Sequence, residues 1–203
     1  MKTRKLLALL LLISFLAACT ASKTEEASLL ITNARVVDVE QGTVQQNRTL
    51  VIRDGQIVEV SDESALQRYR AASTVDAQGK YIIPGLWDNH IHLRGGEDLI
   101  AENENLLPLF IAHGVTTVRD AGGDLYPAIR KWQQQIETGE ITGPRILTAG
   151  PKLDGPNPTW EGSIEVASVA QVPAAMDSLQ QLGVDFVKIY DSTISGDVFL
   201  AIV

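Results

Sequence analysis

Two patterns of apolar and polar positions divide the chain near Pro84. Before it, short runs rich in Val, Ile and Thr alternate apolar and polar residues: LLITNARVVDV, RTLVIRDGQIVEV and STVDAQGKYII. A period of two is typical of half-buried β-strands, and Asp54-Gly55 predicts a hairpin turn between two of them. We therefore expect a β-meander, part of a small β-sandwich, over residues 29–82, interrupted by a helical turn in DESALQRYRAA.

After Pro84, apolar runs alternate with longer amphipathic segments, which is typical of βαβ units and a parallel sheet. The expected strands are LWDNHIHL, VTTVRDAG, PRILTAGP and VDFVKIYD, and a helix follows each of the first three. The first helix ends at His113-Gly114, so His113 is most simply a helix C-cap residue. The pattern predicts an α/β fold over residues 83–203.

The N-terminus has the composition of an export signal. MKTRK is basic, LLALLLLISFL is apolar but short for a membrane span, and LAAC follows. Small residues before a cysteine resemble the lipobox of bacterial lipoproteins. That resemblance implies a signal peptide over residues 1–18, lipidation of Cys19, a polar tether over residues 19–28, and a lipid anchor in a bacterial membrane after export, on the periplasmic or outer-membrane side. An ordinary signal peptide or a membrane anchor is the alternative.

Net charge and cysteine content argue against nucleic-acid binding and exclude an internal disulfide. The formal net charge is −8, and removal of residues 1–18 takes away three cations and no acid, which makes it −11. An acidic chain without a basic patch is not expected to bind nucleic acid. Because Cys19 is the only cysteine, an intramolecular disulfide is excluded.

The strongest chemical signal is the pair His90 and His92 in GLWDNHIHL. Side chains alternate along a strand, so an H-x-H pair places both imidazoles on one face. Asp88 is expected on that face, where a carboxylate can orient an imidazole. The pair stands at the carboxyl end of the first βα strand, where α/β barrels carry their active sites. An isolated H-x-H pair can equally consist of surface or core histidines.

Lys188, in FVKIY, is expected at the carboxyl end of the fourth strand. If its side chain faces a barrel interior, burial lowers the lysine pKa and favours the neutral amine. A neutral amine can add carbon dioxide to form a carbamate, which is an anionic metal ligand. The alternative is a lysine that reaches solvent or pairs with an acid such as Asp191.

Together these motifs resemble the metal-dependent amidohydrolase superfamily. VIRDGQIVEV and VDAQGKYIIPGLWDNHIHL resemble its N-terminal signature, GVTTVRDAGG its second strand, and LGVDFVKIY the fourth-strand segment of its imidazolonepropionase- and prolidase-like branch. The resemblance implies a (β/α)8 barrel flanked by a small β-sandwich. It also implies one or two divalent ions, zinc being the usual one, held by His90 and His92 and bridged by Lys188 as a carboxylated lysine.

The implied activity is metal-dependent hydrolysis of amide or cyclic-amide C–N bonds in a small molecule or dipeptide: a dipeptide, an imidazolone-type ring or an N-acyl compound. The family's other ligands are two histidines and an aspartate from later strands, whereas no histidine follows His113 here. Such barrels need about 250 residues, so we expect only the first half of the barrel, strands 1–4, with the general-base aspartate beyond Val203. We expect this truncated chain to be inactive, and the full-length form can be oligomeric. The alternative is a non-catalytic lipoprotein fragment that binds metal or ligand weakly.

Four further residues are candidates for substrate contacts or for supporting the metal ligands. Arg119 can meet a substrate carboxylate or form a structural salt bridge, and Asp120 is most simply a hydrogen-bond acceptor at a strand end. Asp154 and Trp160 lie in the long loop GPKLDGPNPTW, which either shapes specificity or only packs. The glycine pairs Gly95-Gly96 and Gly122-Gly123 lack the context of a phosphate-binding loop.

Overall fold

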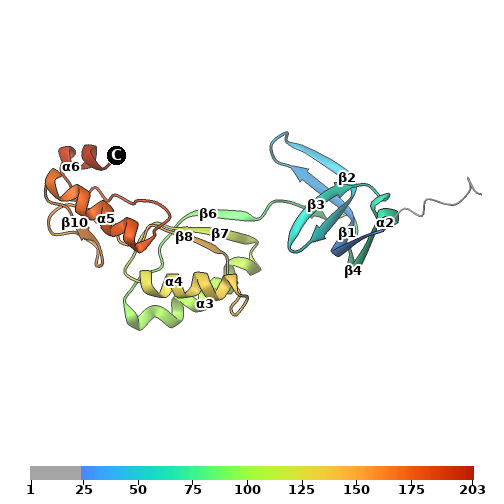
Figure 1. Ribbon diagram of the computed structural model, residues 1–203, viewed down its shortest axis with the longest axis horizontal. Helices are drawn as coiled ribbons and strands as arrows, with labels where there is room; N and C mark the ends of the chain where they lie inside the picture. The colour runs from blue at the N-terminus through green and yellow to red at the C-terminus, as the bar shows by residue number, and fades with distance from the viewer. Residues whose placement is uncertain (1–23) are drawn as a thin grey trace, which may run out of the picture. The chain divides into compact units, whose positions relative to one another are not determined.

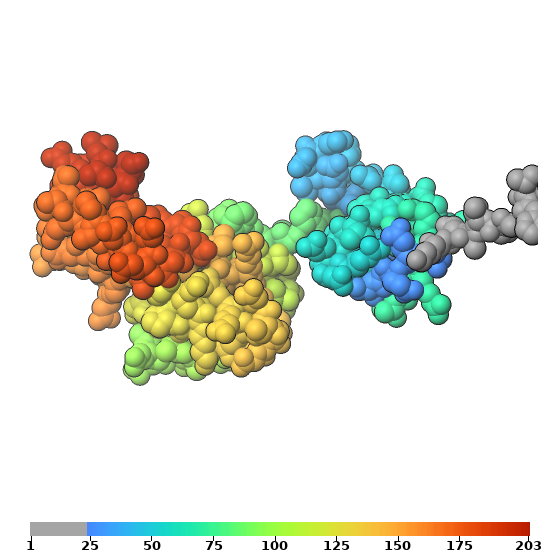
Figure 2. All heavy atoms as spheres, in the orientation of Figure 1, coloured from blue at the N-terminus to red at the C-terminus, as the bar shows by residue number. Residues whose placement is uncertain are grey.

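The computed structural model describes residues 24–203 (Figure 1). They divide into two compact units, with the boundary between Pro84 and Gly85. The space-filling view draws the first unit in blue to teal and the second in green to red (Figure 2). The predicted signal peptide, Cys19 and the first part of the predicted tether lie outside the described residues. Within residues 24–203, no helix combines the length and apolar character that crossing a bilayer requires.

The first unit is built on one five-stranded sheet with the order β3-β2-β1-β4, in which β5 also pairs with β1. Its elements are β1 (Glu25–Asp38), β2 (Thr43–Arg53), β3 (Gln56–Ser61), α2 (Ala65–Arg68), β4 (Tyr69–Asp76) and β5 (Tyr81–Ile82). The predicted hairpin is confirmed: Arg53 pairs with Gln56, and Asp54 and Gly55 have φ values of 50° and 75°. Two positive φ values are those of a type I′ turn, which matches the twist of a hairpin.

The prediction of a meander is right for β1, β2 and β3 and wrong for β4. The β4 strand runs parallel to β1 on the side opposite β2, with Leu30 paired to Thr74. A parallel neighbour requires a crossover, and the chain from β3 through α2 to β4 provides it. Residue pattern alone does not distinguish this crossover from another hairpin.

The predicted tether also extends too far. Residues 25–28 belong to β1, where Ala27 is only 6% exposed and packs with Leu30 and Val51. The Arg53 side chain holds this end of the strand, since its Nε donates to the Glu26 carbonyl at 2.9 Å and its guanidinium pairs with Glu25. Paired backbone and a buried alanine make this segment part of the fold.

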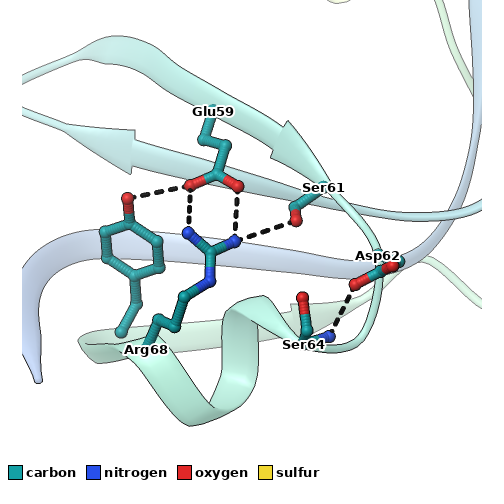
Figure 3. Close-up of polar contacts among 6 residues, drawn as sticks. Glu59, Ser61, Asp62, Ser64 and Arg68 are labelled. Atoms are coloured by element: carbon teal, nitrogen blue, oxygen red, sulfur yellow. Dashed lines mark hydrogen bonds and ion pairs between the residues drawn. The ribbon is translucent and has the colours of Figure 1, made fainter. Parts of the chain in front are cut away.

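A polar cluster ties α2 to β3 in the first unit (Figure 3). The Arg68 guanidinium donates to both carboxylate oxygens of Glu59 and to the Ser61 hydroxyl, and the Tyr69 hydroxyl donates to Glu59 at 2.9 Å. These hydrogen bonds, Arg68 first, lower the pKa of Glu59 to about 2. The cluster fastens the helical turn at which the crossover begins.

The second unit contains a parallel three-stranded sheet, β6-β7-β8, with two helices on one face (Figure 1). Its first elements are β6 (Leu86–Ile91), η1 (Glu97–Leu99), α3 (Ile100–Ala112), β7 (Val115–Asp120), α4 (Tyr126–Glu137) and β8 (Arg145–Thr148). Buried Leu107 of α3, Trp132 of α4 and Val118 of β7 form the core between helices and sheet. This βαβαβ arrangement is the one that the alternating pattern predicts.

A second core follows the sheet and packs around Leu153, Val172 and Leu179. Its elements are β9 (Leu153–Asp154), β10 (Ile164–Glu165), η2 (Val169–Gln171), α5 (Val172–Leu182) and α6 (Gly196–Ile202). The predicted long loop, residues 150–160, therefore contains β9, which pairs in parallel with β10 just beyond the loop.

The prediction of a fourth strand over residues 184–191 is wrong. The parallel sheet within residues 85–203 has three strands, not the four expected. A single bridge joins Ile189 to Leu153. Where a ladder to β8 would start, the Asp185 side chain accepts the Thr148 N–H at 2.8 Å. A side-chain acceptor that replaces a backbone carbonyl interrupts the regular pairing that defines a strand.

Candidate metal centre

An irregularity in β6 decides which way its side chains point. Asp88 pairs with Val118 and Ile91 pairs with Asp120, so the register shifts by one residue between them. This bulge places Asp88 and Ile91 on the same side of the sheet, although three positions separate them. Ile91 packs against the helix-side core, and His90 and His92 take the opposite side. Asp88 therefore does not share their face, and it accepts the backbone N–H of His90 at 3.1 Å.

The two imidazoles converge on one point. Their Nε2 atoms are 3.3 Å apart, and the ring planes meet at 64°. The Nδ1 of His92 lies 2.8 Å from the Gly122 carbonyl oxygen. Because a carbonyl only accepts, Nδ1 carries the hydrogen, and the lone pair of neutral His92 is on Nε2. The arrangement presents that lone pair to His90.

This donor set fits a divalent cation. Two nitrogens about 2.0–2.1 Å from zinc in tetrahedral geometry are about 3.4 Å apart, close to the 3.3 Å between the two Nε2 atoms. Imidazole nitrogens also suit other divalent transition metals. Among residues 24–203, no group of three or more His, Cys, Asp and Glu side chains is placed to hold a metal. Among the described residues, His90 and His92 thus form a two-ligand site with no third His, Cys, Asp or Glu placed to join them.

Asp120 lies at the end of β7 and is fully buried. Its carboxylate accepts the Leu93 N–H at 3.0 Å and the Thr148 hydroxyl at 2.7 Å. Burial is the main cause that raises the pKa of Asp120, and the hydrogen bonds from Leu93 and Thr148 oppose it. The carboxyl group is therefore an acceptor at the end of β7 that links it to Leu93, just after β6, and to Thr148 of β8.

Lys188 lies in the segment after α5, partly exposed. Its carbonyl oxygen accepts the Leu153 N–H at 2.9 Å, and its charge helps to lower the pKa of Lys152. The two ion pairs of the described residues are Arg53–Glu25 and Arg68–Glu59, so no pairing of Lys188 with Asp191 occurs there. The structure places Lys188 beside the loop after β8.

The remaining predicted residues make aromatic or structural contacts. The Arg119 guanidinium lies 5.0 Å from the centre of the Phe186 ring, in place of a salt bridge. The Trp160 ring lies under two cations, Arg94 at 4.4 Å and Lys152 at 5.0 Å.

Two other residues are used by the fold. His113 is the C-cap of α3, and its Nδ1 donates to the Leu109 carbonyl at 2.8 Å. Asp154 is fully buried and accepts hydrogen bonds from Ser192, Thr193 and Gly155, so these partners already use its carboxylate. The buried Asp154 carboxylate is therefore not available to a substrate in this arrangement.

Two residues to which the sequence assigns no role in the site, Gly122 and Lys152, lie next to His92 or to each other. Gly122 supplies the carbonyl that orients His92, and its φ of +93° is one that other residues rarely adopt. The stem of Lys152 packs against Gly122: a Cβ built there would lie 2.7 Å from the Lys152 Cγ. The only sequence feature that could have pointed to Lys152 is its position in the mostly apolar stretch between β8 and Leu153. That position does not show that the lysine side chain is buried.

No family model matches the chain, but individual proteins do. An adenine deaminase of Halalkalibacterium halodurans is 38% identical over 98 residues, which cover 48% of this chain and 16% of the deaminase. A dihydroorotase of Trichlorobacter lovleyi is 40% identical over 67 residues, which cover 33% of this chain and 15% of that enzyme. The matched part of this chain thus corresponds to about one sixth of the length of these curated relatives.

Solved structures resemble the chain over a greater length. A candidate prolidase from Bifidobacterium longum has 27% identity and a TM-score of 0.70, and the match covers 86% of this chain and 45% of that one. An amidohydrolase crystal structure has 25% identity and the same TM-score, and the match covers 86% and 52% of the two chains. Together, these similarities support the amidohydrolase superfamily for this chain.

Proposed function

We propose that this chain carries the first metal ligands of a metal-dependent hydrolase that cleaves amide or cyclic-amide C–N bonds. The observation that carries the proposal is the convergence of His90 and His92, with Nε2 atoms 3.3 Å apart and the His92 tautomer set by Gly122. The adenine deaminases, dihydroorotases and prolidases that the chain resembles all act on C–N bonds, which supports this class of reaction.

In this proposal His90 and His92 hold a divalent cation, zinc being the first choice. When bound, such a cation supplies Lewis-acid polarisation of the scissile carbonyl and a water that ionises near neutral pH. His92 is held for this task by its hydrogen bond to Gly122, and Asp120 links the neighbouring strand ends through Leu93 and Thr148. Lys188 is the proposed bridging ligand, after its neutral amine has added carbon dioxide and released a proton.

Three finer features belong to the proposal. The second unit is taken as the first part of a (β/α)8 barrel, and the first unit as part of the β-sandwich that flanks it. The protein is taken to be lipid-anchored through Cys19 after export. The matched structures are about twice as long as the matched region, so the rest of the metal site and the general base are assigned to later strands.

The test is hydrolysis by the full product of the gene, stripped of metal with a chelator and then reloaded with zinc. We expect zinc-dependent cleavage within a panel of dipeptides, cyclic imides and N-acyl amino acids, and its loss in the double variant His90→Ala, His92→Ala. His113→Ala is the matched control, because the third histidine caps a helix and should leave the rate unchanged. A product that neither binds zinc nor cleaves any of these substrates would contradict the proposal.

A further inference from the structure

The hydroxyl group of Thr148, the last residue of β8, serves two buried partners at once. Thr148 is fully buried. Its Oγ1 accepts the Gly150 N–H at 3.0 Å and donates to a carboxylate oxygen of Asp120 at 2.7 Å. A buried N–H and a buried carboxylate therefore depend on this one hydroxyl, and its loss would leave both without that partner.

The backbone of Thr148 is held as well as its side chain. The Asp185 carboxylate accepts the Thr148 N–H at 2.8 Å, and the Asp185 N–H donates to the Thr148 carbonyl oxygen at 2.9 Å. Thr148 thus uses its N–H, its carbonyl and its hydroxyl in hydrogen bonds. The position of the hydroxyl is fixed by these bonds together with the surrounding packing.

One branch of hydrogen bonds runs from Thr148 to His92 through Asp120. The carboxylate oxygen of Asp120 that Thr148 does not use accepts the Leu93 N–H at 3.0 Å. Leu93 directly follows His92 in the chain and is 2% exposed. The bond therefore fixes the backbone on the C-terminal side of His92.

A second branch runs through the peptide group between Gly122 and Gly123. Its carbonyl oxygen accepts the His92 Nδ1 hydrogen at 2.8 Å, and its N–H donates to the Gly150 carbonyl oxygen at 3.4 Å. The C=O and N–H of a trans peptide point in opposite directions, so this group is held from both sides. Gly150 in turn donates its own N–H to Thr148.

The two branches close a ring of hydrogen bonds around an exposed ligand. His92 is exposed to solvent, whereas the other members of the ring are all buried: Leu93, Asp120, Gly122, Gly123, Thr148 and Gly150. An exposed imidazole is otherwise free to turn. A hydrogen-bond network stiffens a site when its members are all satisfied, and here the Thr148 hydroxyl joins the two branches.

We propose that Thr148 is a positioning residue for metal binding, whose hydroxyl holds His92 in the orientation and tautomer that a metal ligand needs. The inference rests on the proposed role of His92 as a metal ligand. It adds a residue of β8, although His92 follows β6 and β7 lies between these two strands. Thr148 acts through Asp120 and through Gly150, so loss of its hydroxyl loosens both branches together.

The first test reads the His92 ring in the metal-free protein, by long-range ¹H–¹⁵N NMR at a pH about two units above the ordinary histidine pKa, where imidazoles are neutral. We expect the hydrogen on Nδ1 in wild type and a mixture of tautomers in Thr148→Val, which keeps the side-chain shape but lacks the hydroxyl. Thr148→Ser restores the hydroxyl and should restore the Nδ1 tautomer. His113 is the internal control, because its Nδ1 donates to the Leu109 carbonyl in all these proteins.

The second test is the affinity for cobalt(II) of the same proteins. Loss of a hydrogen-bond partner behind a metal ligand typically weakens metal binding by about 10- to 100-fold. We expect about tenfold weaker binding in Thr148→Val and binding close to wild type in Thr148→Ser. Thr49→Val is the matched control, because Thr49 is a threonine of β2 in the first unit and only 1% exposed. It should bind cobalt as wild type does.

An unchanged His92 tautomer in Thr148→Val would overturn the inference, as would an equal loss of cobalt affinity in Thr49→Val. If Thr148→Val does not fold, native-state amide exchange of the wild type decides. The N–H groups of Leu93, Gly123 and Gly150 should open in one event, with protection factors equal within about threefold, and protection absent at Gly123 alone would overturn the inference.

Failure of this inference is distinguishable from failure of the proposed function. The tautomer of His92 is measured without metal, so a chain that binds no metal and cleaves no amide would refute the proposed function alone. A chain that binds cobalt through His90 and His92 but keeps its His92 tautomer in Thr148→Val would refute the role of Thr148 alone.

Discussion

His92 donates its Nδ1 hydrogen to the carbonyl oxygen of Gly122 at 2.8 Å. One residue of the H-x-H pair is thus oriented by the backbone of a loop that follows a different strand. The hydrogen bond fixes the tautomer, which leaves Nε2 free as a ligand. The affinity of His90 and His92 for a metal should therefore depend on Gly122, although Gly122 is not a metal ligand.

Gly122→Ala tests this dependence. Its φ of +93° disfavours alanine, and the new Cβ would collide with Lys152, so the Gly122 carbonyl should move. We expect zinc affinity, measured by competition with a chromophoric chelator, to fall about tenfold. Gly114→Ala is the control, because Gly114 has a φ of +79° with open space around its Cβ position. It should lower stability and leave zinc affinity unchanged; equal affinities for zinc in both variants would refute the role of Gly122.

Replacement of Asp120 should expose its structural role. Asp120→Ala leaves the Leu93 N–H and the Thr148 hydroxyl without their acceptor, which should cost about 2–4 kcal/mol in the free energy of unfolding. Asp120→Asn keeps one oxygen acceptor and can donate to the hydroxyl, so its cost should be smaller. Urea unfolding of the metal-free protein measures both, and an alanine variant as stable as wild type would contradict this account.

The pH dependence of that comparison has a definite sign. Because the pKa of Asp120 is raised in the folded state, its protonated form is favoured by folding. Stability relative to Asp120→Asn is then greatest below the ordinary aspartate pKa and falls as the pH rises through the raised value. The urea midpoints of the two proteins should be compared over a series of pH values. The midpoint of the wild type, relative to that of Asp120→Asn, should fall as the pH rises.

Glu59 should behave in the opposite way in the first unit. Its pKa is lowered to about 2, chiefly by Arg68, so its contribution to stability is present above the ordinary glutamate pKa. That contribution is lost as the pH falls toward about 2. The difference in urea midpoint between wild type and Glu59→Gln should therefore shrink in acid. A difference that does not change with pH would show that the Glu59–Arg68 cluster does not form.

Asp154 should hold the segment after residue 191 against β9. Although burial alone would raise it, hydrogen bonds, first from Ser192 and then from Gly155, keep the pKa of Asp154 below its usual value. Asp154→Asn should cost about 1–3 kcal/mol and increase amide hydrogen exchange in residues 190–195. Ser192→Ala removes one of these bonds and should have a smaller effect. Unaltered exchange in Asp154→Asn would contradict the assignment.

Local pattern was sufficient where neighbouring residues determine the structure. The alternation of apolar residues predicts most strands, Asp54-Gly55 predicts its hairpin, and His113-Gly114 ends its helix as expected. Pairing partners are not local, so the parallel β4 and the interrupted ladder at Asp185 were not predicted.

The same limit applies to the site. The H-x-H spacing predicts two imidazoles on one face, and they do converge. The shift that moves Asp88 to the other face depends on how β6 pairs with β7. The packing of the Lys152 stem against Gly122 joins residues 30 positions apart in the sequence. Long-range packing, which one sequence does not reveal, created both features.

The central claim is that His90 and His92 hold a divalent metal. The most direct measurement is a cobalt(II) titration of the 203-residue chain, followed by the visible absorption of the bound ion, in wild type, His113→Ala and the double variant His90→Ala, His92→Ala. We predict saturable binding in wild type and His113→Ala, and affinity at least about tenfold weaker in the double variant. A double variant that titrates like wild type would contradict the claim.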